Sequence, residues 1–575
     1  MRYLPCGERG VLIECADLDE TLRLFAPLRG AVQRAHEAIE SDAGAIRCAL
    51  ASVTELVPAA RTILVAFDPL RTSRRLLVEA LQAVPIADSV DAHAKTVEIP
   101  VTYDGEDLAD VARLLGVSET QIVERHSASP WSVAFVGFAP GFAYLVGGDA
   151  LFDVPRRSTP RVRVPAGSVG LAGTFSGVYP RESSGGWQLI GRTDAPMWDL
   201  LAETPALLQP GDAVRFVPVR ECVAAASPVE ESEGKRPPGK APERTQESLD
   251  ALESTGFYNG LTSERCYLQV VRPGLLATIQ DGGRRAANMG VTGSGAADAI
   301  AFRLANALVG NAPDAPALEA TDGGICLKAQ GNVVVAVTGA QAKVTIDGDR
   351  GCTEVHGQRA TLLRDGETLE IGRPTGGLRN YVAVRGGFAV AKVLGSASTD
   401  TMSGIGPEPL RPRQLLTVGA PGVMGAGECH LQGEHGTNTH PSVGNGVPWR
   451  RDLPKAGETS ELTAVLGPRD DWFSDAGIAT CAGQEWEVTA QSNRVGLRLR
   501  GTQPIQWREE RELASEGTPA GAIQVPPSGQ PVVFLRDQPV TGGYPVIAVL
   551  TEQSLALAGQ LPPGARVRLR LVAAE

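Results

Sequence analysis

The sequence predicts a mainly β protein that begins with a small α+β unit. Short apolar runs recur between turn-forming residues along most of the 575 residues, and the chain carries 66 glycines and 41 prolines. Such an excess of turn formers, without a collagen-like period, is typical of many short strands. In addition, the stretch 165–192 recurs in modified form near the C-terminus. We therefore expect a β-rich chain in which one structural unit is used twice.

Residues 1–95 form the predicted α+β unit. The runs GVLIE and RTILVAF are short and apolar, as expected of strands. Between them, apolar residues follow one another at helical spacing over 20–40: Leu22, Phe25, Leu28, Val32 and Ala35. This spacing predicts an amphipathic helix that covers the strands.

Residues 96–222 form a second predicted unit, in which a short helix precedes a run of strands. Ser118-Glu119-Thr120-Gln121 has the pattern of a capping box, and the helix that it opens ends near His126. Strands follow at WSVAFVGF, RVRVPAG, WQLIGR and AVRFVPV. His126 at the end of its helix has two interpretations, stabilisation of the helix dipole or a catalytic role.

Residues 223–262 predict a disordered linker, because they are rich in Pro, Glu, Ser and Lys and lack apolar periodicity. Strands dominate again in the two units that follow it, 263–435 and 436–575, with runs such as NVVVAVTGA and YVAVRGGFAV. One helix is expected there. Its predicted features are an N-cap at Ser294, Asp298 in the first turn, a buried stripe of Ile300, Leu304 and Leu308, and a stop at Gly310.

The internal repeat has two matching parts. Pro165, Gly167 and Val169 correspond to Pro519, Gly521 and Ile523, and Gly185-Gly186-Trp187 corresponds to Gly542-Gly543-Tyr544. These glycines could turn a barrel corner or form a bulge. Alternatively, glycine amides with Arg192 nearby could hold an anion such as a phosphate or a carboxylate.

A second glycine-containing run, FVGFAPGFAYLVGG (135–148), places Pro140-Gly141 between two apolar-aromatic segments. Proline followed by glycine suits the central positions of a type II turn. The same residues would also let the backbone approach a ligand closely. The sequence is compatible with both the turn and the ligand-binding interpretation.

Charge and composition disfavour several classes of protein. The formal net charge is −12, whereas partners such as nucleic acid or anionic membrane require a basic face. Residues 1–10 lack the apolar core of a signal peptide, and no apolar run reaches the length of a membrane span. Nine cysteines without a C-x-x-C pair favour a reduced cytoplasm. The cluster Cys429, His430, His435 and His440 has spacings that favour a solvated loop over a metal site.

Longer stretches resemble one family over nearly the whole chain. GERGVLIE, ELVPAARTILVAFDP, PRRSTPRVRVPAGSVGLAG and YPRESSGGWQLIGRT are similar to the allophanate hydrolase subunit 1 family, which includes the B subunit of 5-oxoprolinase and the sporulation kinase inhibitor KipI. RPGLLATIQDGGRR, GVTGSGAADAIAFRLANALVGN and GAIQVPPSGQPVVFLRDQPVTGGYPVIAVL resemble the subunit 2 family, which includes the C subunit of 5-oxoprolinase and KipA. The same pair forms the carboxyltransferase region of urea carboxylase.

The resemblance implies cyclophilin-like β-barrels, one in the first half and two in the second. Three places depart from the family pattern: Ala286-Ala287 stand where Gly-Tyr is common, Ala397 stands where arginine is frequent, and Arg413-Gln414 stand where Gly-Asp is usual. The loss of an arginine at 397 weakens any anion-binding role for its loop.

Three functions attach to the family. The first is hydrolysis of 5-oxoproline to glutamate with ATP and Mg²⁺, which requires a separate partner like the A subunit of 5-oxoprolinase. The second is biotin-dependent carboxyl transfer, for which this chain lacks a biotin-bearing lysine after any of its five methionines. The third is binding to a histidine kinase. We favour the first, in a protein that is compatible with a homo-oligomer and binds neither nucleic acid nor membrane.

The predicted catalytic residues are His126, Arg192, Asp281 and Arg284. The residues predicted to bind the small-molecule substrate or ATP are Gly137, Phe138, Pro140, Gly141, Pro165, Gly167, Ser168, Tyr179, Gly185, Gly186, Trp187, Gln188, Gln280, Ser294, Gly295, Asp298, Arg494, Gln524, Gly542, Gly543 and Tyr544. No metal site is predicted.

Overall fold

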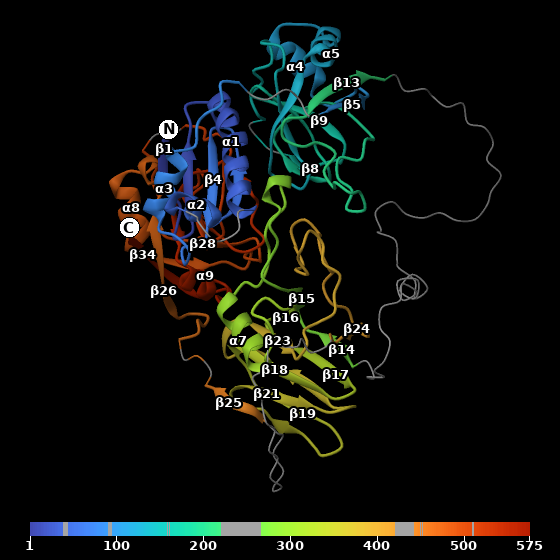
Figure 1. The fold of residues 1–575 in the computed structure, drawn as a ribbon, viewed down its shortest axis with the longest axis vertical. Coiled ribbons are helices and arrows are strands. Elements are labelled where there is room, and N and C mark those ends of the chain that lie inside the picture. The colour runs from blue at the N-terminus through green and yellow to red at the C-terminus, as the bar shows by residue number, and fades with distance from the viewer. Residues whose placement is uncertain are drawn as a thin grey trace, which may run out of the picture.

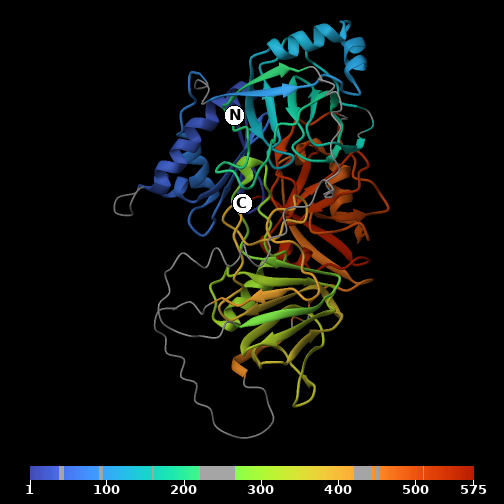
Figure 2. The ribbon, with the colours of Figure 1, turned by 90° about the vertical axis from the view of Figure 1, so that its right-hand side faces the viewer.

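The computed structural model is elongated, with the N-terminal unit and two barrels towards one end and a β-sandwich at the other (Figure 1, Figure 2). It describes residues 1–37, 44–89, 95–157, 159, 161–219, 266–419, 442–448, 450, 452–508 and 511–574. The predicted linker 223–262 and the cysteine–histidine cluster between 429 and 440 lie outside these residues. None of the described helices is long and apolar enough to cross a membrane.

The N-terminal unit is a four-stranded antiparallel sheet with three helices. The sheet order β1-β2-β4-β3 corresponds to Arg2–Pro5, Gly10–Glu14, Thr62–Phe67 and Val53–Pro58. The helices are α1 (Leu18–Glu37), α2 (Ala45–Ala51) and α3 (Arg74–Gln82). The predicted stripe of α1 is confirmed for Phe25, Leu28, Val32 and Ala35, which are buried against the sheet.

The first barrel follows as a seven-stranded sheet in the order β12-β9-β10-β7-β6-β13-β5. These strands are Gln188–Arg192, Ser168–Ala172, Phe175–Val178, Ala143–Val146, Trp131–Val136, Ala213–Pro218 and Thr96–Val101. The sheet is nearly closed, because Thr102 and Arg192 exchange backbone hydrogen bonds of 2.9 and 2.8 Å between its two edges. A short pair, β8 (Arg161–Val164) and β11 (Ser183–Gly185), lies beside it.

Two helices, α4 (Leu108–Leu115) and α5 (Glu119–Ala128), lie in the chain between β5 and β6, the first two strands of the first barrel. The predicted capping box is confirmed. The Ser118 hydroxyl accepts from the Gln121 N–H, and the Gln121 side chain accepts from the Ser118 N–H.

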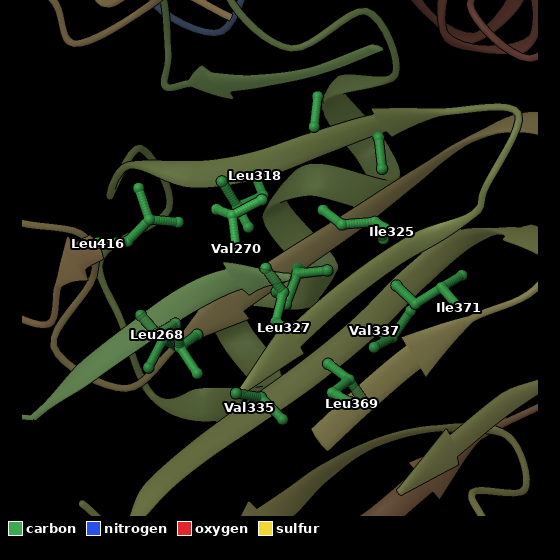
Figure 3. Close-up of a cluster of buried hydrophobic side chains, with 14 of the residues drawn as sticks. Leu268, Val270, Leu318, Ile325, Leu327, Val335, Val337, Leu369, Ile371 and Leu416 are labelled. Atoms are coloured by element: carbon green, nitrogen blue, oxygen red, sulfur yellow. The ribbon is translucent and has the colours of Figure 1, made fainter. Parts of the chain in front are cut away.

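The sandwich of the second half consists of two six-stranded sheets. One has the order β20-β19-β22-β17-β14-β24, which is Thr353–Glu354, Val344–Asp347, Thr368–Ile371, Ile325–Gln330, Tyr267–Pro273 and Leu415–Thr417. The other has the order β15-β16-β23-β18-β21-β25, which is Leu276–Gln280, Ala317–Thr321, Gly376–Val384, Val333–Gln341, Gln358–Leu363 and Ser442–Val447. Figure 3 shows apolar side chains of both sheets, such as Leu327 and Val335, meeting in one core.

This sandwich differs from the closed barrel expected over 263–435. No ladder among the described residues joins β20 or β24 at the edges of one sheet to β15 or β25 of the other. The chain passes between sheets at Gly274, whose φ of 73° breaks the strand between β14 and β15. β25, which the predicted boundary at 436 assigns to the last unit, pairs with β21 of the sandwich.

Helix α7 (Ala299–Val309) packs on the sandwich and begins later than predicted. Its N-cap is Asp298, whose carboxylate accepts from the N–H groups of Ile300 and Ala301. Ser294 has a left-handed φ of 52° and cannot serve as the predicted extended N-cap. The buried stripe is also shifted, to Ala301, Phe302, Ala305 and Val309, and Ile300 is 47% exposed. The predicted stop at Gly310 is confirmed, with φ 75°.

The last barrel is closed, in the order β26-β33-β30-β31-β28-β27-β34. These strands are Thr459–Leu466, Val546–Leu550, Ala522–Gln524, Val532–Phe534, Gly496–Arg500, Glu485–Val488 and Arg566–Val572. Its other elements are η2 (Asp470–Trp472), α8 (Asp475–Gly483), β29 (Glu516–Gly517), β32 (Thr541–Gly542) and α9 (Glu552–Ala558). Because the barrel is closed, its order can equally be written β33-β30-β31-β28-β27-β34-β26. These strands correspond one by one to β12-β9-β10-β7-β6-β13-β5 of the first barrel, which confirms the predicted duplication.

The two halves of the chain contact one another in at least two places. The last barrel packs on the N-terminal sheet through an apolar cluster that contains Leu12, Val57 and Leu64 from one side and Phe534 and Val549 from the other. The loop that holds η1 (Ala287–Met289) extends from the sandwich to the first half, where the Ala287 N–H donates to Glu55 Oε1 at 2.8 Å (Figure 1). Both halves therefore contribute to the surfaces where the barrels meet.

Candidate functional site

A pocket of about 140 Å³ lies where the first barrel meets the last. The two copies of the Gly-Gly segment, which are 357 positions apart in the chain, both line it. The lining residues are Phe138, Phe142, Tyr144, Arg156, Tyr179, Gly185, Gly186, Trp187, Ser515, Thr541, Gly542 and Gly543. We call this site the inter-barrel pocket.

The FVGFAPGF run forms one wall of the inter-barrel pocket and is also a tight turn. The Phe142 N–H donates to the Ala139 carbonyl at 3.0 Å, and Gly141 has a φ of 76°, as a type II turn requires. The Phe138 N–H donates to Thr541 Oγ1 at 3.0 Å across the interface. A Cβ at Gly137 would lie 2.5 Å from that hydroxyl. The close backbone approach is thus to the last barrel, and the phenyl rings face the pocket.

The Gly-Gly segments bring backbone to the pocket, and at Gly185 and Gly542 a side chain would not fit. A Cβ at Gly185 would lie 2.3 Å from the Tyr179 hydroxyl. Trp187, which is 5% exposed, packs edge-on against Phe142 and Tyr144, with ring centroids 5.2 and 5.5 Å apart. In the other copy, Tyr544 is 47% exposed and does not line the pocket.

Two tyrosines contribute hydroxyl groups to this site. Burial raises the pKa of Tyr144, while hydrogen bonds with Ser515 and Thr541 of the last barrel act to lower it. Burial also raises the pKa of Tyr179 to about 12. Both groups are therefore neutral donors at pH 7.

The other residues of the predicted repeat hold the turns in place. Gly167, with φ 79°, donates its N–H to the Tyr179 carbonyl at 2.7 Å, and Ser168 Oγ donates to the Pro165 carbonyl at 2.8 Å. The side chains of Gln188 and Gln524 donate to the carbonyls of Pro155 and Tyr544. None of these side chains lines the inter-barrel pocket.

His126 lies inside the first barrel and has no exposed surface. Its Nδ1 is 2.8 Å from the Tyr103 hydroxyl and its Nε2 is 2.8 Å from Ser176 Oγ, and its ring stacks on Phe216 with centroids 4.4 Å apart. Burial lowers the pKa of His126 to about 3, so the ring is neutral. In this position it has no atom within reach of a ligand at the surface.

Arg192 ends strand β12, away from the Gly-Gly segment that precedes the strand. Its side chain is 51% exposed and its Nε donates to Asp104 Oδ2 at 2.8 Å. Arg192 is not among the residues that line the inter-barrel pocket. The structure therefore separates the arginine from the glycine amides with which it was predicted to act.

The remaining predicted residues gather in a second place, a buried polar cluster between the sandwich and the last barrel. Asp281 accepts from Ser396 Oγ and Ser398 Oγ, both at 2.6 Å, and from the Ala397 N–H at 2.7 Å. Ala397 thus contributes its backbone N–H to this network.

Arg494 crosses from the last barrel to the sandwich within this cluster. It bonds Asp537 at 3.0 Å and the Gly295 carbonyl at 2.7 Å, and also pairs with Glu319. Ser294 Oγ donates to the same Asp537 at 2.9 Å. Asp298, besides capping α7, accepts from Gln560 at 2.9 Å. These contacts are those of an interface between the two subdomains.

Arg284 is the exception in the cluster. It is 4% exposed, yet its Nε and Nη1 have no hydrogen-bond partner among the described residues, and only Nη2 donates, to the Ser398 carbonyl. Gln280 is fully buried with its Oε1 unpartnered. Burial raises the pKa of the neighbouring Asp400, and the charge of Asp537 adds to this effect. Unpartnered buried N–H groups of this kind mark a place for water or a ligand.

Five lining residues of the inter-barrel pocket were not predicted: Phe142, Tyr144, Arg156, Ser515 and Thr541. Phe142 and Tyr144 stand within the predicted FVGFAPGFAYL run, so the run itself was a signal. Thr541 directly precedes the second Gly-Gly pair. Arg156 belongs to the PRRSTPRVRVPAG stretch that carries the resemblance but was not singled out there, and Ser515 lies in a segment without a recognisable pattern. Only the fold brings these two residues to the pocket.

Two family models match the chain: carboxyltransferase domain, subdomain C and D, over residues 1–208, and carboxyltransferase domain, subdomain A and B, over residues 289–571. The C subunit of 5-oxoprolinase from Escherichia coli (strain K12) is 35% identical over 298 residues, which are 52% of this chain and 88% of that protein. The chain belongs to the carboxyltransferase-domain family.

Other relatives of this carboxyltransferase-domain chain match its two halves or all of it. The B subunit of 5-oxoprolinase from Escherichia coli O157:H7 is 42% identical over 179 residues, 30% of this chain and 81% of that protein. Urea amidolyase of Saccharomyces cerevisiae is 31% identical over 329 residues, 55% of this chain and 17% of that protein. The crystal structure of TTHA0988 covers 98% of this chain and 99% of its own, with a TM-score of 0.75 and 31% identity.

The predicted resemblance is confirmed by these matches. The chain is a fused region with one part like the B subunit of 5-oxoprolinase, the B-like part, and one part like its C subunit, the C-like part. This homology indicates a component of an enzyme.

Proposed function

We propose that this chain is the fused B/C component of an ATP-dependent 5-oxoprolinase, which hydrolyses 5-oxo-L-proline to L-glutamate together with a separate protein like the A subunit of that enzyme, here called the A-type partner. The observation that carries the proposal is the inter-barrel pocket. Its lining comes from both the B-like and the C-like part of the chain. A site shared in this way accounts for a single chain that keeps both parts.

The chemistry suits a site with donors and aromatic walls rather than a strong nucleophile. A lactam resists water, and ATP supplies the phosphoryl group that turns the amide oxygen into part of a leaving group. A first water then adds at the same carbon, the C–N bond breaks and the nitrogen takes up a proton as the free amine. A second water hydrolyses the acyl phosphate that remains, which releases phosphate and leaves the carboxylate of glutamate. We assign to this chain the task of holding the ring against Phe142 and Trp187, with the hydroxyls of Tyr144 and Thr541 beside its polar edge.

ATP itself does not fit the inter-barrel pocket. Pockets for ligands of drug size occupy roughly 300–1,000 Å³, whereas this one measures about 140 Å³. The described residues include no group of three or more His, Cys, Asp or Glu side chains placed to hold a metal ion. We propose that ATP reaches the complex with its own Mg²⁺ and is bound outside this pocket.

The test is an assay of glutamate and phosphate release from 5-oxoproline and ATP, with and without candidate A-type partners. We expect little activity from the chain alone and stoichiometric release of both products with the partner. Gly543→Val should abolish turnover without unfolding the chain, because an added Cβ meets no atom closer than 3.6 Å and the side chain takes up pocket volume. Gly483→Val is the matched control, since it lies on the same barrel with open space around it.

Carboxyl transfer is the second candidate, and the match to carboxyltransferase-domain models favours it. It would need a biotin carrier and a biotin-charging enzyme as separate proteins. Transfer from carboxybiotin to urea by this chain, with no stimulation by any A-type partner, would replace the first proposal with this one. Failure of both assays together with binding to a histidine kinase would favour the regulatory function known from KipI.

A further inference from the structure

We propose that Arg156 selects the ligand of the inter-barrel pocket by pairing with a single carboxylate. The ligand class is a small cyclic amide that bears one carboxylate next to its ring. The inference rests on the proposed function of the same pocket and names the feature of the substrate that the chain recognises. Nothing in the sequence pattern pointed to Arg156.

The position of Arg156 is fixed by its neighbour in the chain. The Arg157 N–H donates to the Gly186 carbonyl at 2.8 Å, which ties this segment to the first Gly-Gly pair. Among the described residues that line the pocket, Arg156 is the only charged one. Two other arginines nearby already have acidic partners: Arg157 and Arg161 bond the buried Asp107 at 2.6 and 2.8 Å, and Arg161 also bonds Glu106 at 3.0 Å.

The ion pair of Arg156 is weak enough for a ligand to replace. Its Nε lies 3.7 Å from Glu512 Oε1, beyond hydrogen-bond distance, and the two side chains are 46% and 77% exposed. Exposed pairs of this geometry contribute little stability. A guanidinium can instead bind a carboxylate through two parallel N–H···O bonds, which are stronger and directional.

The rest of the pocket matches the uncharged part of such a ligand. Phe138, Phe142 and Trp187 present ring faces and edges to a volume of about 140 Å³, which admits one small ring. Thr541 and Ser515 supply hydroxyl groups from the opposite barrel. The positive charge of Arg156 reaches the interior, because it acts against the burial that raises the pKa of Tyr144 and Tyr179. One cation in an otherwise neutral site suits one carboxylate.

Calorimetric titration of the full chain alone tests this inference, with 5-oxoproline and with 2-pyrrolidinone, the same lactam ring without the carboxylate. We expect 5-oxoproline to bind at least tenfold more tightly than 2-pyrrolidinone. Arg156→Gln should weaken 5-oxoproline about tenfold to hundredfold, as expected for the loss of a charge-assisted pair. The same variant should leave 2-pyrrolidinone unchanged.

Arg125→Gln is the matched control, because Arg125 is 43% exposed and pairs with Asp149 on the first barrel. It should bind 5-oxoproline like the unchanged chain. Equal affinity of Arg156→Gln and the unchanged chain for 5-oxoproline, or no binding by either, overturns the inference.

The enzyme assay separates this inference from the proposed function. With an A-type partner, Arg156→Gln should raise KM for 5-oxoproline while kcat changes less. Full activity with an unchanged KM keeps the proposed function and rejects the role of Arg156. Binding that depends on Arg156, in a chain that no A-type partner activates, keeps the role of Arg156 and rejects the proposed function.

Discussion

The first and last barrels are two copies of one unit, and their common features are those that set geometry. Both have the same strand order, including one parallel pair, β13 with β5 and β34 with β26. In both, a buried tryptophan donates its indole N–H to the residue five positions earlier: Trp131 to the His126 carbonyl at 2.8 Å, and Trp486 to the Cys481 carbonyl at 2.9 Å. The helix before that tryptophan has a serine N-cap in each copy.

The differences between the copies are those that set chemistry. Five positions before the tryptophan, the first barrel has the buried His126 and the last barrel has the buried Cys481. The first Gly-Gly pair is followed by the buried Trp187 and the second by the exposed Tyr544. The aromatic walls of the inter-barrel pocket thus come from the first barrel, while the last contributes backbone and hydroxyl groups. Duplication of the unit placed two similar edges face to face, and divergence made them complementary.

The largest difference in the free energy of unfolding is expected between substitutions of Trp187 and Tyr544, the aromatic residues that follow the two Gly-Gly pairs. Trp187→Ala should lower the free energy of unfolding by about 3–5 kcal/mol, because it removes a buried ring that packs on Phe142 and Tyr144. Tyr544→Ala should change it by less than about 0.5 kcal/mol, because that ring is 47% exposed. Urea unfolding of the two variants measures both values. Equal losses would show that the copies do not differ as described.

The second prediction is that His126, unlike Cys481, makes the free energy of unfolding depend on pH below 6.5. Burial lowers the pKa of His126 from 6.5 to about 3, so the unfolded chain binds a proton between these values while the folded chain does not. Stability from the neutral ring is therefore fully present above pH 6.5 and falls by about 1.4 kcal/mol per pH unit below it.

The stability advantage of the unchanged chain over His126→Asn should accordingly shrink between pH 6.5 and pH 4. Cys481→Ser supplies the comparison, because burial raises the pKa of Cys481 to about 12 and its loss adds no slope in this range. A pH-independent difference for His126→Asn would mean that folding does not change the pKa of the histidine.

The smallest expected effect concerns Arg192. Its ion pair with Asp104 lies at the surface, with the two side chains 51% and 44% exposed, and such pairs contribute about 0–1 kcal/mol. Arg192→Ala should therefore leave both stability and 5-oxoproline turnover with an A-type partner nearly unchanged. A hundredfold loss of turnover in a folded variant would restore the anion-binding interpretation of the segment 165–192.

The sequence was sufficient for features that depend on local pattern. The stripe of α1, the capping box of α5 and the duplicated Pro-Ala-Gly and Gly-Gly segments could all be predicted, because spacing and turn chemistry determine them. The N-cap of α7 was misplaced at Ser294, since Asp298 and Ser294 are both good capping residues and only the backbone decides between them.

Features that depend on long-range pairing could not be predicted. An open sandwich and a closed barrel have the same strand pattern, and the edges that fail to pair are far apart in the sequence. The resemblance placed the two Gly-Gly segments in different barrels, but did not imply that they face one another. For the same reason Arg156 and Thr541, which are 385 positions apart in the numbering, gave no sign of a common site.

A crystal structure of the chain with 5-oxoproline would show whether the two copies together form one ligand site. We expect the lactam ring between Trp187 and the Gly542-Gly543 segment, with its carboxylate on Arg156. A ligand bound instead beside the unpartnered N–H groups of Arg284, with the inter-barrel pocket empty, would contradict it.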